Sequence, residues 1–272
     1  MRYKEFLRYD MHVHSSLCGG KDTHEQFVRA AIDRGMRTIG FSEHSRVSAL
    51  GLGMTEDDER YYREEIDRLR EKYGNQIRIL RGIEQDFYSD LPPLGYDYVI
   101  GSVHFLRVNG EYCRVDGSEE EMQEVIRQYF RGDVFAFLRL YFQTVSELPR
   151  KTACDVIGHF DLIANTCKNF FDTSDHFYLG YAIKAIQRLV DENVIFEVNT
   201  KAFFDSEYRM FHPSTVLLNY ILGCGGRILF SSDSISNGEL TRGFFGAATV
   251  CRSMGVGSFE ILTEKGWEKS FI

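Results

Sequence analysis

Short apolar runs alternate with longer amphipathic stretches along almost the whole chain. The runs have the length of β-strands, whereas the longer stretches carry apolar residues at helical spacing. Strands are predicted at residues 10–14, 37–44, 76–84, 96–104, 154–159, 194–200, 227–233 and 258–262. Helices are predicted at residues 25–35, 56–74, 118–148, 176–193, 214–226 and 244–255.

This alternation of strand and helix predicts an α/β architecture built on parallel strands. The strands are apolar on both faces, as is typical of strands buried beneath helices. No glycine-rich nucleotide loop follows the first strand, which favours a closed or nearly closed barrel over an open sheet. The chain contains no repeat, low-complexity segment or linker cluster, so we expect a single domain over residues 1–272.

Ionisable and polar side chains gather where the predicted strands end. In chain order they are His12 and His14, Glu43 and His44, Glu84, His104, His159 and Asp161, Glu197 and Asn199, and Asp233. In an α/β barrel these ends share one face, and that face carries the active site. The remaining histidines lie in or near predicted helices and are weaker candidates: His24, His176 and His212.

The strand-end residues indicate a metal site. His12 and His14 alone also fit an ordinary polar strand end. However, so many ionisable groups in one barrel mouth would repel one another unless multivalent cations lay between them. The two-residue spacing of His12 and His14 places both rings on one face of a strand, where a single ion can bind both. Imidazole and carboxylate donors together favour zinc, manganese or iron.

Composition narrows the function further. The net charge of -8 argues against general nucleic-acid binding, which needs a basic face. An anionic substrate would therefore need bound cations to reverse the local field. The six cysteines include no C-x-x-C pair, so neither a zinc finger nor a disulfide scaffold is expected. No signal peptide or apolar run of membrane-spanning length is found, and we expect a cytoplasmic protein without a membrane partner.

Taken together, the motifs resemble the PHP (polymerase and histidinol phosphatase) superfamily, and within it the monofunctional histidinol-phosphate phosphatases. The resemblance runs through DMHVH, GFSEHS, GIEQDF, YDYVIGSVHFL, DVIGHFDLI, EVNTKAF and SSDS. It implies a distorted (β/α)7 barrel with two or three metal ions at its strand ends. It also implies hydrolysis of L-histidinol phosphate to L-histidinol and phosphate, a step of histidine biosynthesis.

The resemblance also implies a set of metal ligands. One ion falls to His12, His14, Glu84 and Asp233. A second falls to Glu84, His104 and His159, with Glu84 bridging the two ions.

The ligands of a third ion depart from the family pattern. Gly20 stands where the family has His or Asp, and Ile235 stands where its last motif ends in His. His44 is the one clear ligand that remains. We therefore expect a two-metal centre whose third position is weak or empty. Asp22, His24 or Cys18 can substitute only if the loop that carries them shifts.

The phosphate ligands depart as well. Relatives hold the phosphate with arginines after the GHxD and xNT motifs, where this chain has Asn165 and Lys201. Lysine supplies a point charge but lacks the bidentate fork of arginine. Asn165 supplies only a neutral donor, although Lys168 is close in sequence. Lys201 also fits a solvated surface lysine, and both changes bear on the substrate rather than on the reaction class.

The expected nucleophile is a hydroxide that bridges the metals, because the chain has neither a G-x-S-x-G elbow nor a cysteine in a nucleophile motif. Asp161 is predicted to orient a ligand or assist proton transfer. Glu43 and Asp10 either do the same or form rim hydrogen bonds and helix caps. His44, if free of metal, is a candidate general acid, because its reference pKa lies near 6.5.

Two alternatives remain open at this point. One is a phosphoesterase of the same fold that acts on another small phosphate ester or a nucleotide. The other is a non-catalytic metal-binding module, which the retention of six converging ligands disfavours. Four aromatic residues near the strand ends either stack on a substrate ring or pack the core, and packing is favoured: Tyr88, Phe105, Phe203 and Phe204.

Overall fold

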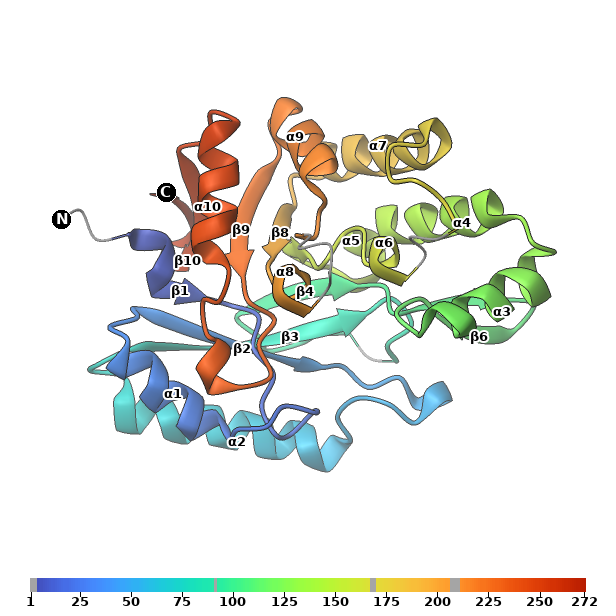
Figure 1. Cartoon of the computed structure of the whole chain (residues 1–272). Helices are drawn as coiled ribbons and strands as arrows, with labels where there is room; N and C mark the ends of the chain where they lie inside the picture. The colour runs from blue at the N-terminus through green and yellow to red at the C-terminus, as the bar shows by residue number, and fades with distance from the viewer. Residues whose placement is uncertain (1–3, 91, 167–169, 206–210) are drawn as a thin grey trace.

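A seven-stranded parallel sheet rolled almost into a barrel forms the centre of the computed structural model (Figure 1). The structure describes residues 4–90, 92–166, 170–205 and 211–272. In spatial order the strands are β1 (Tyr9–Asp10), β2 (Thr38–His44), β3 (Arg78–Asp86), β4 (Tyr98–Ser102), β7 (Val156–Ile157), β8 (Ile195–Asn199) and β9 (Arg227–Ser231). Every neighbouring pair in this order is parallel. The predicted distorted (β/α)7 barrel is confirmed.

A single bridge just beyond the strand ends brings the two edges of the sheet together. Val13 pairs in parallel with Ser234, and the amide of His14 donates to the carbonyl of Ser234 at 2.9 Å. The first and last strands are therefore held together at the end where the candidate ligands lie.

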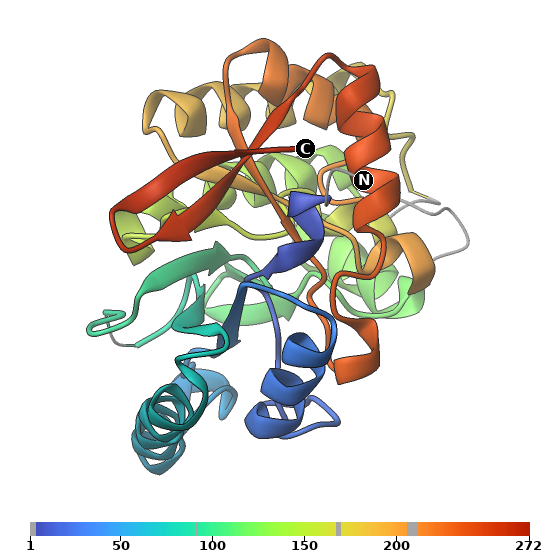
Figure 2. The same cartoon turned by 90° about the vertical axis from the view of Figure 1, so that its left-hand side faces the viewer.

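Helices surround the sheet (Figures 1 and 2). They are α1 (His24–Asp33), α2 (Glu56–Tyr73), α3 (Glu119–Phe130), α4 (Val134–Ser146), α5 (Leu148–Thr152), α6 (Ile163–Thr166), α7 (His176–Asp191), α8 (Ala202–Asp205), α9 (Thr215–Gly223) and α10 (Phe244–Ser253). Short 3-10 turns are Glu5–Arg8, Ser48–Leu50 and Asn237–Glu239. Capping boxes begin α1, α2 and α3, at Thr23, Thr55 and Ser118. No helix in these described segments is long and apolar enough to cross a membrane.

The inside of the barrel is a small apolar cluster. Its members come from the strands, the residue after β1 and one hairpin: Met11, Leu80, Tyr98, Ile100, Val156, Ile195, Leu229 and Leu262, with the partly buried Trp267 packed against them. Alternate residues of the same strands point to the opposite face and pack against the helices. Tyr98 fills the space beside two glycines, since a Cβ at Gly82 would lie 2.2 Å from its ring.

The eighth predicted strand lies outside the barrel sheet. Residues 258–262 fall in β10 (Ser258–Thr263), which pairs antiparallel with β11 (Gly266–Phe271). The β10–β11 hairpin, red in Figure 2, places Leu262 and Trp267 against the barrel interior. Arg78, at the start of β3, donates to the carbonyl of Leu262, so the hairpin covers the end of the barrel opposite to the strand ends that carry the ligands.

Two further differences concern local structure. A second hairpin, β5 (Phe105–Val108) with β6 (Glu111–Arg114), follows β4 directly, where the sequence analysis expected no strands. The helical stretch 118–148 is divided between α3, α4 and the start of α5. The break between α3 and α4 lies at Arg131 and Gly132, both with positive φ, a backbone conformation that ends a helix.

Candidate metal centre

The strand ends bring all seven predicted metal ligands to one side of the barrel. His12, His14, Glu84, His159 and Asp233 are less than 9 % exposed, and the side chains of His104 and His44 are 14 % and 41 % exposed. His159 and Asp233 have φ angles of 20° and 49°, which are uncommon for residues with a side chain. Such backbone outliers concentrate at functional sites.

The first group of donors has the spacing of a metal site. The Nε2 atoms of His12 and His14 lie 3.0 Å apart, and each lies 3.5 Å from Oε2 of Glu84. Asp233 Oδ1 lies 3.9 Å and 3.5 Å from the same two nitrogens. Tetrahedral zinc with bonds of about 2.0–2.1 Å places its ligand atoms about 3.4 Å apart. His12, His14 and Glu84 therefore fit one ion, and Asp233 lies beside both histidines.

The second group uses the other oxygen of Glu84. Glu84 Oε1 lies 2.9 Å from Nε2 of His159 and 3.3 Å from Nε2 of His104. Ser102 donates a hydrogen bond of 2.7 Å to the same oxygen. Glu84 thus presents one oxygen to each group of histidines, which is the geometry of a bridging carboxylate.

Carboxylates behind two of these histidines fix the orientation of the rings. Nδ1 of His12 lies 2.5 Å from Glu197, and Nδ1 of His104 lies 3.2 Å from Asp86. Glu197 also accepts the backbone amide of His159 at 2.7 Å. A carboxylate behind a histidine leaves the other ring nitrogen facing the site, as in many metal centres.

Electrostatics at the centre favour bound cations. Burial would lower the pKa of His12, but Glu197, Asp233 and Glu84 hold it well above its usual value. Burial would raise the pKa of Glu84, but His104, His12 and His44 hold it well below its usual value. Burial, together with His44 and His12, lowers the pKa of His14 to about 3. The carboxylates that raise the pKa of His12 supply the negative charge that a bound cation would balance, and His14 presents the neutral imidazole that a divalent transition metal binds.

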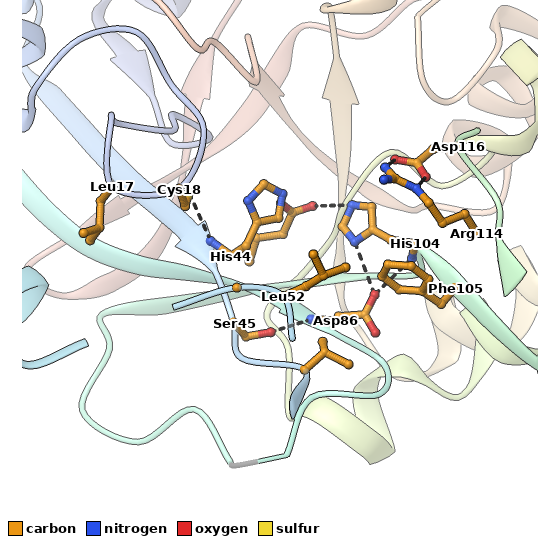
Figure 3. A pocket seen from close by; sticks show the side chains of 13 residues that line it. Leu17, Cys18, His44, Ser45, Leu52, Asp86, His104, Phe105, Arg114 and Asp116 are labelled. Atoms are coloured by element: carbon orange, nitrogen blue, oxygen red, sulfur yellow. Dashed lines mark hydrogen bonds and ion pairs between the residues drawn. The ribbon is translucent and has the colours of Figure 1, made fainter. Parts of the chain in front are cut away.

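His44 stands between this centre and a cavity of about 300 Å³ (Figure 3). Its Nε2 lies 3.2 Å from Glu84 Oε2, and its ring stacks on that of His14 with centroids 4.4 Å apart. Burial lowers the pKa of His44, and His104 adds to this effect against the attraction of Glu84. The cavity is also lined by Leu17, Leu52, Asp86, Phe105, Arg114 and Asp116.

The predicted phosphate-binding residues differ in their distance from the metal centre. Nζ of Lys201 lies 3.0 Å from Oδ1 of Asp233, so this lysine is at the metal centre. Asn165 instead pairs with Nε2 of His212 at 2.7 Å, and its buried Oδ1 has no hydrogen-bonding partner in the described part of the chain. Lys168 lies outside the described residues.

Asp161 and Glu43, which were predicted to support a metal ligand, hydrogen-bond to other residues instead. Asp161 accepts from His212 at 2.7 Å and from the amide of Ser214 at 2.9 Å. Glu43 pairs with His24 at 2.9 Å. The carboxylates of both residues therefore hold loops in place.

Asp10 also forms structural hydrogen bonds. It accepts the backbone amide of Ser232 at 3.1 Å and that of Thr241 at 2.9 Å. This matches the simpler of the two roles considered for Asp10, a hydrogen bond at the rim.

Two histidines that the sequence analysis ranked low are buried beside the centre. His212 is 2 % exposed and His24 is 3 % exposed, and each pairs with a carboxylate. Neither follows a barrel strand, so the strand-end pattern could not identify them. The one sequence feature that could have pointed to His212 and His24 is their buried partners, Asp161 and Glu43. Each of these acids lies at a strand end, and a buried carboxylate needs a cationic or hydrogen-bond-donating partner.

The aromatic residues near the strand ends differ in position. Phe105 lines the cavity. Tyr88 packs edge-to-face on Phe87 and Tyr112, and Phe203 stacks on Phe211. These two pack against protein, as expected, whereas Phe105 is open to the cavity; the side chain of Phe204 lies outside the described part of the structure.

Comparison with known proteins decides the family. The sequence profile of the PHP domain matches residues 10–201, which is most of the chain. The chain belongs to the PHP domain family. The matched range covers every candidate ligand from His12 to His159 and ends before Asp233, so the place of Asp233 in the centre depends on the geometry.

Proteins named as histidinol phosphatases resemble this chain over nearly its whole length. A Schizosaccharomyces pombe protein named probable histidinol-phosphatase is 28 % identical over 89 % of this chain and 84 % of its own. The HisK structure from Listeria monocytogenes superposes with a TM-score of 0.75 at 21 % identity, over 88 % of this chain and 99 % of its own. HisK from Lactococcus lactis, in complex with zinc, L-histidinol and phosphate, gives 0.71 at 20 % identity, over 96 % and 98 %.

Proposed function

We propose that this protein is a metal-dependent phosphatase that hydrolyses L-histidinol phosphate to L-histidinol and phosphate. The observation that carries the proposal is Glu84, whose two oxygens face two separate groups of histidines. The names of the relatives, and the L-histidinol and phosphate held by the Lactococcus lactis protein, supply the substrate.

The proposed ligands are His12, His14, Glu84 and Asp233 for one ion, and Glu84, His104 and His159 for the other. The donor set fits zinc, manganese or iron. When bound, two such ions activate a water molecule and neutralise the phosphate oxygens during in-line displacement.

Lys201 orients the phosphate end of the substrate, and the carboxylate of Asp233 holds Lys201 in place. Burial would raise the pKa of Asp233, but Lys201 and His12 hold it well below its usual value, so this carboxylate stays charged. The Lys201 side chain is 39 % exposed, and its ammonium can donate to a phosphate oxygen as well as to Asp233. Asn165 pairs with the ring of His212, so any effect of Asn165 on phosphate binding acts through the position of that ring.

His44 is better suited to metal binding than to proton donation. A general acid must carry a proton near neutral pH, whereas burial lowers the pKa of His44. Its Nε2 already faces Glu84. We therefore assign His44 to the edge of the metal centre, and the proton for the leaving alkoxide to water that enters through the cavity.

The cavity beside His104 suits the histidinol end. Phe105 and Leu52 provide apolar walls, and Asp116 and Asp86 provide negative charge. The Arg114 guanidinium beside Asp116 lowers the pKa of that carboxyl against the effect of burial, so Asp116 is ionised. Histidinol phosphate carries an ammonium group and an imidazole, and the carboxylate oxygens of this wall can accept hydrogen bonds from both, although Asp116 is already paired with Arg114.

A substrate panel tests the proposal. Phosphate release is measured from L-histidinol phosphate, p-nitrophenyl phosphate, phosphoserine and AMP, with protein loaded with zinc or manganese. We expect release confined largely to histidinol phosphate. Glu84→Gln should reduce kcat/KM by about a thousandfold or more, because the ions supply several kcal/mol of transition-state stabilisation. Glu64→Gln, an exposed glutamate of α2, is the matched control.

Asp116→Asn separates the substrate from the reaction. The variant should raise KM for histidinol phosphate and leave KM for p-nitrophenyl phosphate unchanged, because only the first has a cationic end. Equal effects on both esters would contradict the proposed placement of the substrate.

One observation favours a second candidate, a PHP phosphatase for another small ester or a nucleotide. Lys201 and Asn165 stand where the resembled phosphatases have arginines, so the phosphate loses two bidentate partners. Efficient release from AMP or phosphoserine, without release from histidinol phosphate, would favour this candidate. Metal binding without release from any ester would favour a non-catalytic module.

A further inference from the structure

Cysteine is a common metal ligand, but Cys18 has no role in the proposed two-ion centre. Its Sγ lies 3.4 Å from Nδ1 of His14 and accepts the backbone amide of His44 at 3.4 Å. Ligand atoms of His14, Cys18 and His44 all lie within 4.8 Å of one another. In Figure 3 Cys18 lies beside His44 at the edge of the cavity.

The loop that carries Cys18 is closed so tightly that position 20 cannot hold a side chain. The amide of Gly20 donates to Ser15 at 2.8 Å, and a Cβ at Gly20 would lie 2.1 Å from the carbonyl oxygen of His14. The amide of Lys21 donates to Ile235 at 2.6 Å, which ties this loop to the one after β9. The two positions without a ligand side chain, 20 and 235, are therefore neighbours in space.

The other two substitutes in the loop are engaged elsewhere. Asp22 accepts the amide of Asn237 at 2.8 Å. His24 lies 2.9 Å from Glu43 and 3.1 Å from Ser15. Of the three residues considered for the missing ligands, Cys18 is the one that contacts His14 and His44.

We propose that Cys18 and His44 bind a third divalent ion at the edge of the centre, and that this position selects zinc over manganese. A thiolate is a soft ligand that suits zinc and binds manganese weakly. The thiol of Cys18 hydrogen-bonds to Glu43, and its proton would be released to solvent when the ion binds. His14 uses Nε2 for the first ion and donates from Nδ1 to the thiolate.

The remaining coordination positions of this ion face the cavity and are completed by water or by an oxygen of the substrate. This inference rests on the proposed metal use but not on the proposed substrate. Zinc-loaded protein should hold three ions per chain and manganese-loaded protein two. For zinc, a bound third ion replaces the weak or empty third position expected from the sequence. For manganese, the third position is still expected to be weak or empty.

Cobalt(II) spectroscopy tests the proposal without an activity assay. Metal-free protein is titrated with cobalt, and the near-ultraviolet band of thiolate-to-cobalt charge transfer is followed. We expect the band to grow with the third equivalent in the unchanged protein. It should be missing in Cys18→Ser and retained in Cys224→Ser, which removes an exposed cysteine.

Two readouts guard against a misfolded variant. The visible cobalt bands of the first two equivalents should be the same in Cys18→Ser and in the unchanged protein, and zinc content should fall from three ions per chain to two. Cys18→Asp should restore a third ion with manganese, because a carboxylate suits the harder metal. A charge-transfer band that survives Cys18→Ser, or that appears with the first equivalent, would overturn the proposal. So would equal zinc and manganese content.

Discussion

At the scale of single residues, the centre is held by side chains that do not touch an ion themselves. Glu197 is the clearest case, because it is buried and contacts His12, the amide of His159 and Ser231. Burial would raise the pKa of Glu197, but His12 lowers it, so the carboxylate is charged. It fixes the His12 ring and the backbone of a ligand on another strand at once.

We expect Glu197→Gln to weaken metal binding by about ten- to a hundredfold, the usual effect of losing a carboxylate behind a ligand histidine. Metal affinity is measured by competition with a chromophoric chelator. Glu268→Gln, on the exposed hairpin strand β11, is the control and should leave affinity unchanged. An unchanged affinity in Glu197→Gln would show that the ring of His12 is fixed by packing alone.

Lys201 makes a second residue-scale prediction. Lys201→Met removes a charged hydrogen bond to the phosphate worth about 1.5–3 kcal/mol, so inhibition by inorganic phosphate should weaken by about ten- to a hundredfold. Lys201→Arg should keep most of the affinity, because the charge remains. If both variants bind phosphate as well as the unchanged protein does, Lys201 is a surface lysine that only contacts Asp233.

The strand-end pattern predicted the candidate ligands because one rule of barrel geometry places every strand end on the same face. His212 and His24 were ranked low for the same reason, since the rule says nothing about loops that fold back over that face. The hydrogen bonds of Asp161 depend on the path of the chain between β8 and α9, which no local pattern encodes.

At the scale of elements, α1 and α2 are joined by a cluster of charged groups around Glu25. Its carboxylate contacts Arg68, Lys72 and Tyr73 of α2 at 2.7 Å each. Hydrogen bonds from Lys72, Tyr73 and Arg68 lower the pKa of Glu25 from 4.5 to about 2. The pKa is lower in the folded state, so the carboxylate stabilises the protein above pH 4.5, and this contribution is lost as pH falls toward 2.

Glu25→Gln should therefore lower the free energy of unfolding by about 1 kcal/mol at pH 7, the size expected of an exposed ion pair. The difference from the unchanged protein should shrink between pH 4.5 and pH 2. Denaturant unfolding of metal-free protein measures it, so that loss of metal in acid does not contribute. Glu71→Gln, an exposed glutamate of α2, is the control, and a pH-independent difference for Glu25→Gln would contradict the assignment.

Most helices could be predicted from periodicity and caps, because an amphipathic face and an N-cap are local signals. The helix α2 matches its prediction closely, from Glu56 to Tyr73. The hairpin β5–β6 was missed although its two-residue turn at Asn109 and Gly110, both with positive φ, is a local hairpin signal. Its separation from the barrel depends on His104, which turns toward Glu84.

At the scale of the whole molecule, the barrel is closed at one end by the ligands and at the other by the β10–β11 hairpin. Leu262 is 8 % exposed and packs with the interior residues of the strands, and Trp267 packs against them. The hairpin is thus part of the barrel core although it lies outside its sheet. Its place could not be predicted, because an apolar strand at the end of the chain equally suits a barrel edge.

Leu262→Ala should lower the free energy of unfolding by about 2–4 kcal/mol, as for other buried leucines. Phe271→Ala, at a side chain 79 % exposed on the same hairpin, should change it by less than about 0.5 kcal/mol. Trp267 is the only tryptophan, so its fluorescence reports unfolding directly. Equal effects of the two changes would show that the hairpin does not fill the barrel.

The central claim is that phosphate release depends on metal held by the strand-end residues, and a titration of activity against metal content tests it most directly. Metal-free protein receives zinc in measured equivalents, and release of phosphate from L-histidinol phosphate is followed at each step. We expect no phosphate release without metal, a steep rise in release as the second ion per chain is bound, and no release from Glu84→Gln. Activity in metal-free protein, or no activity when two ions are bound, would contradict it.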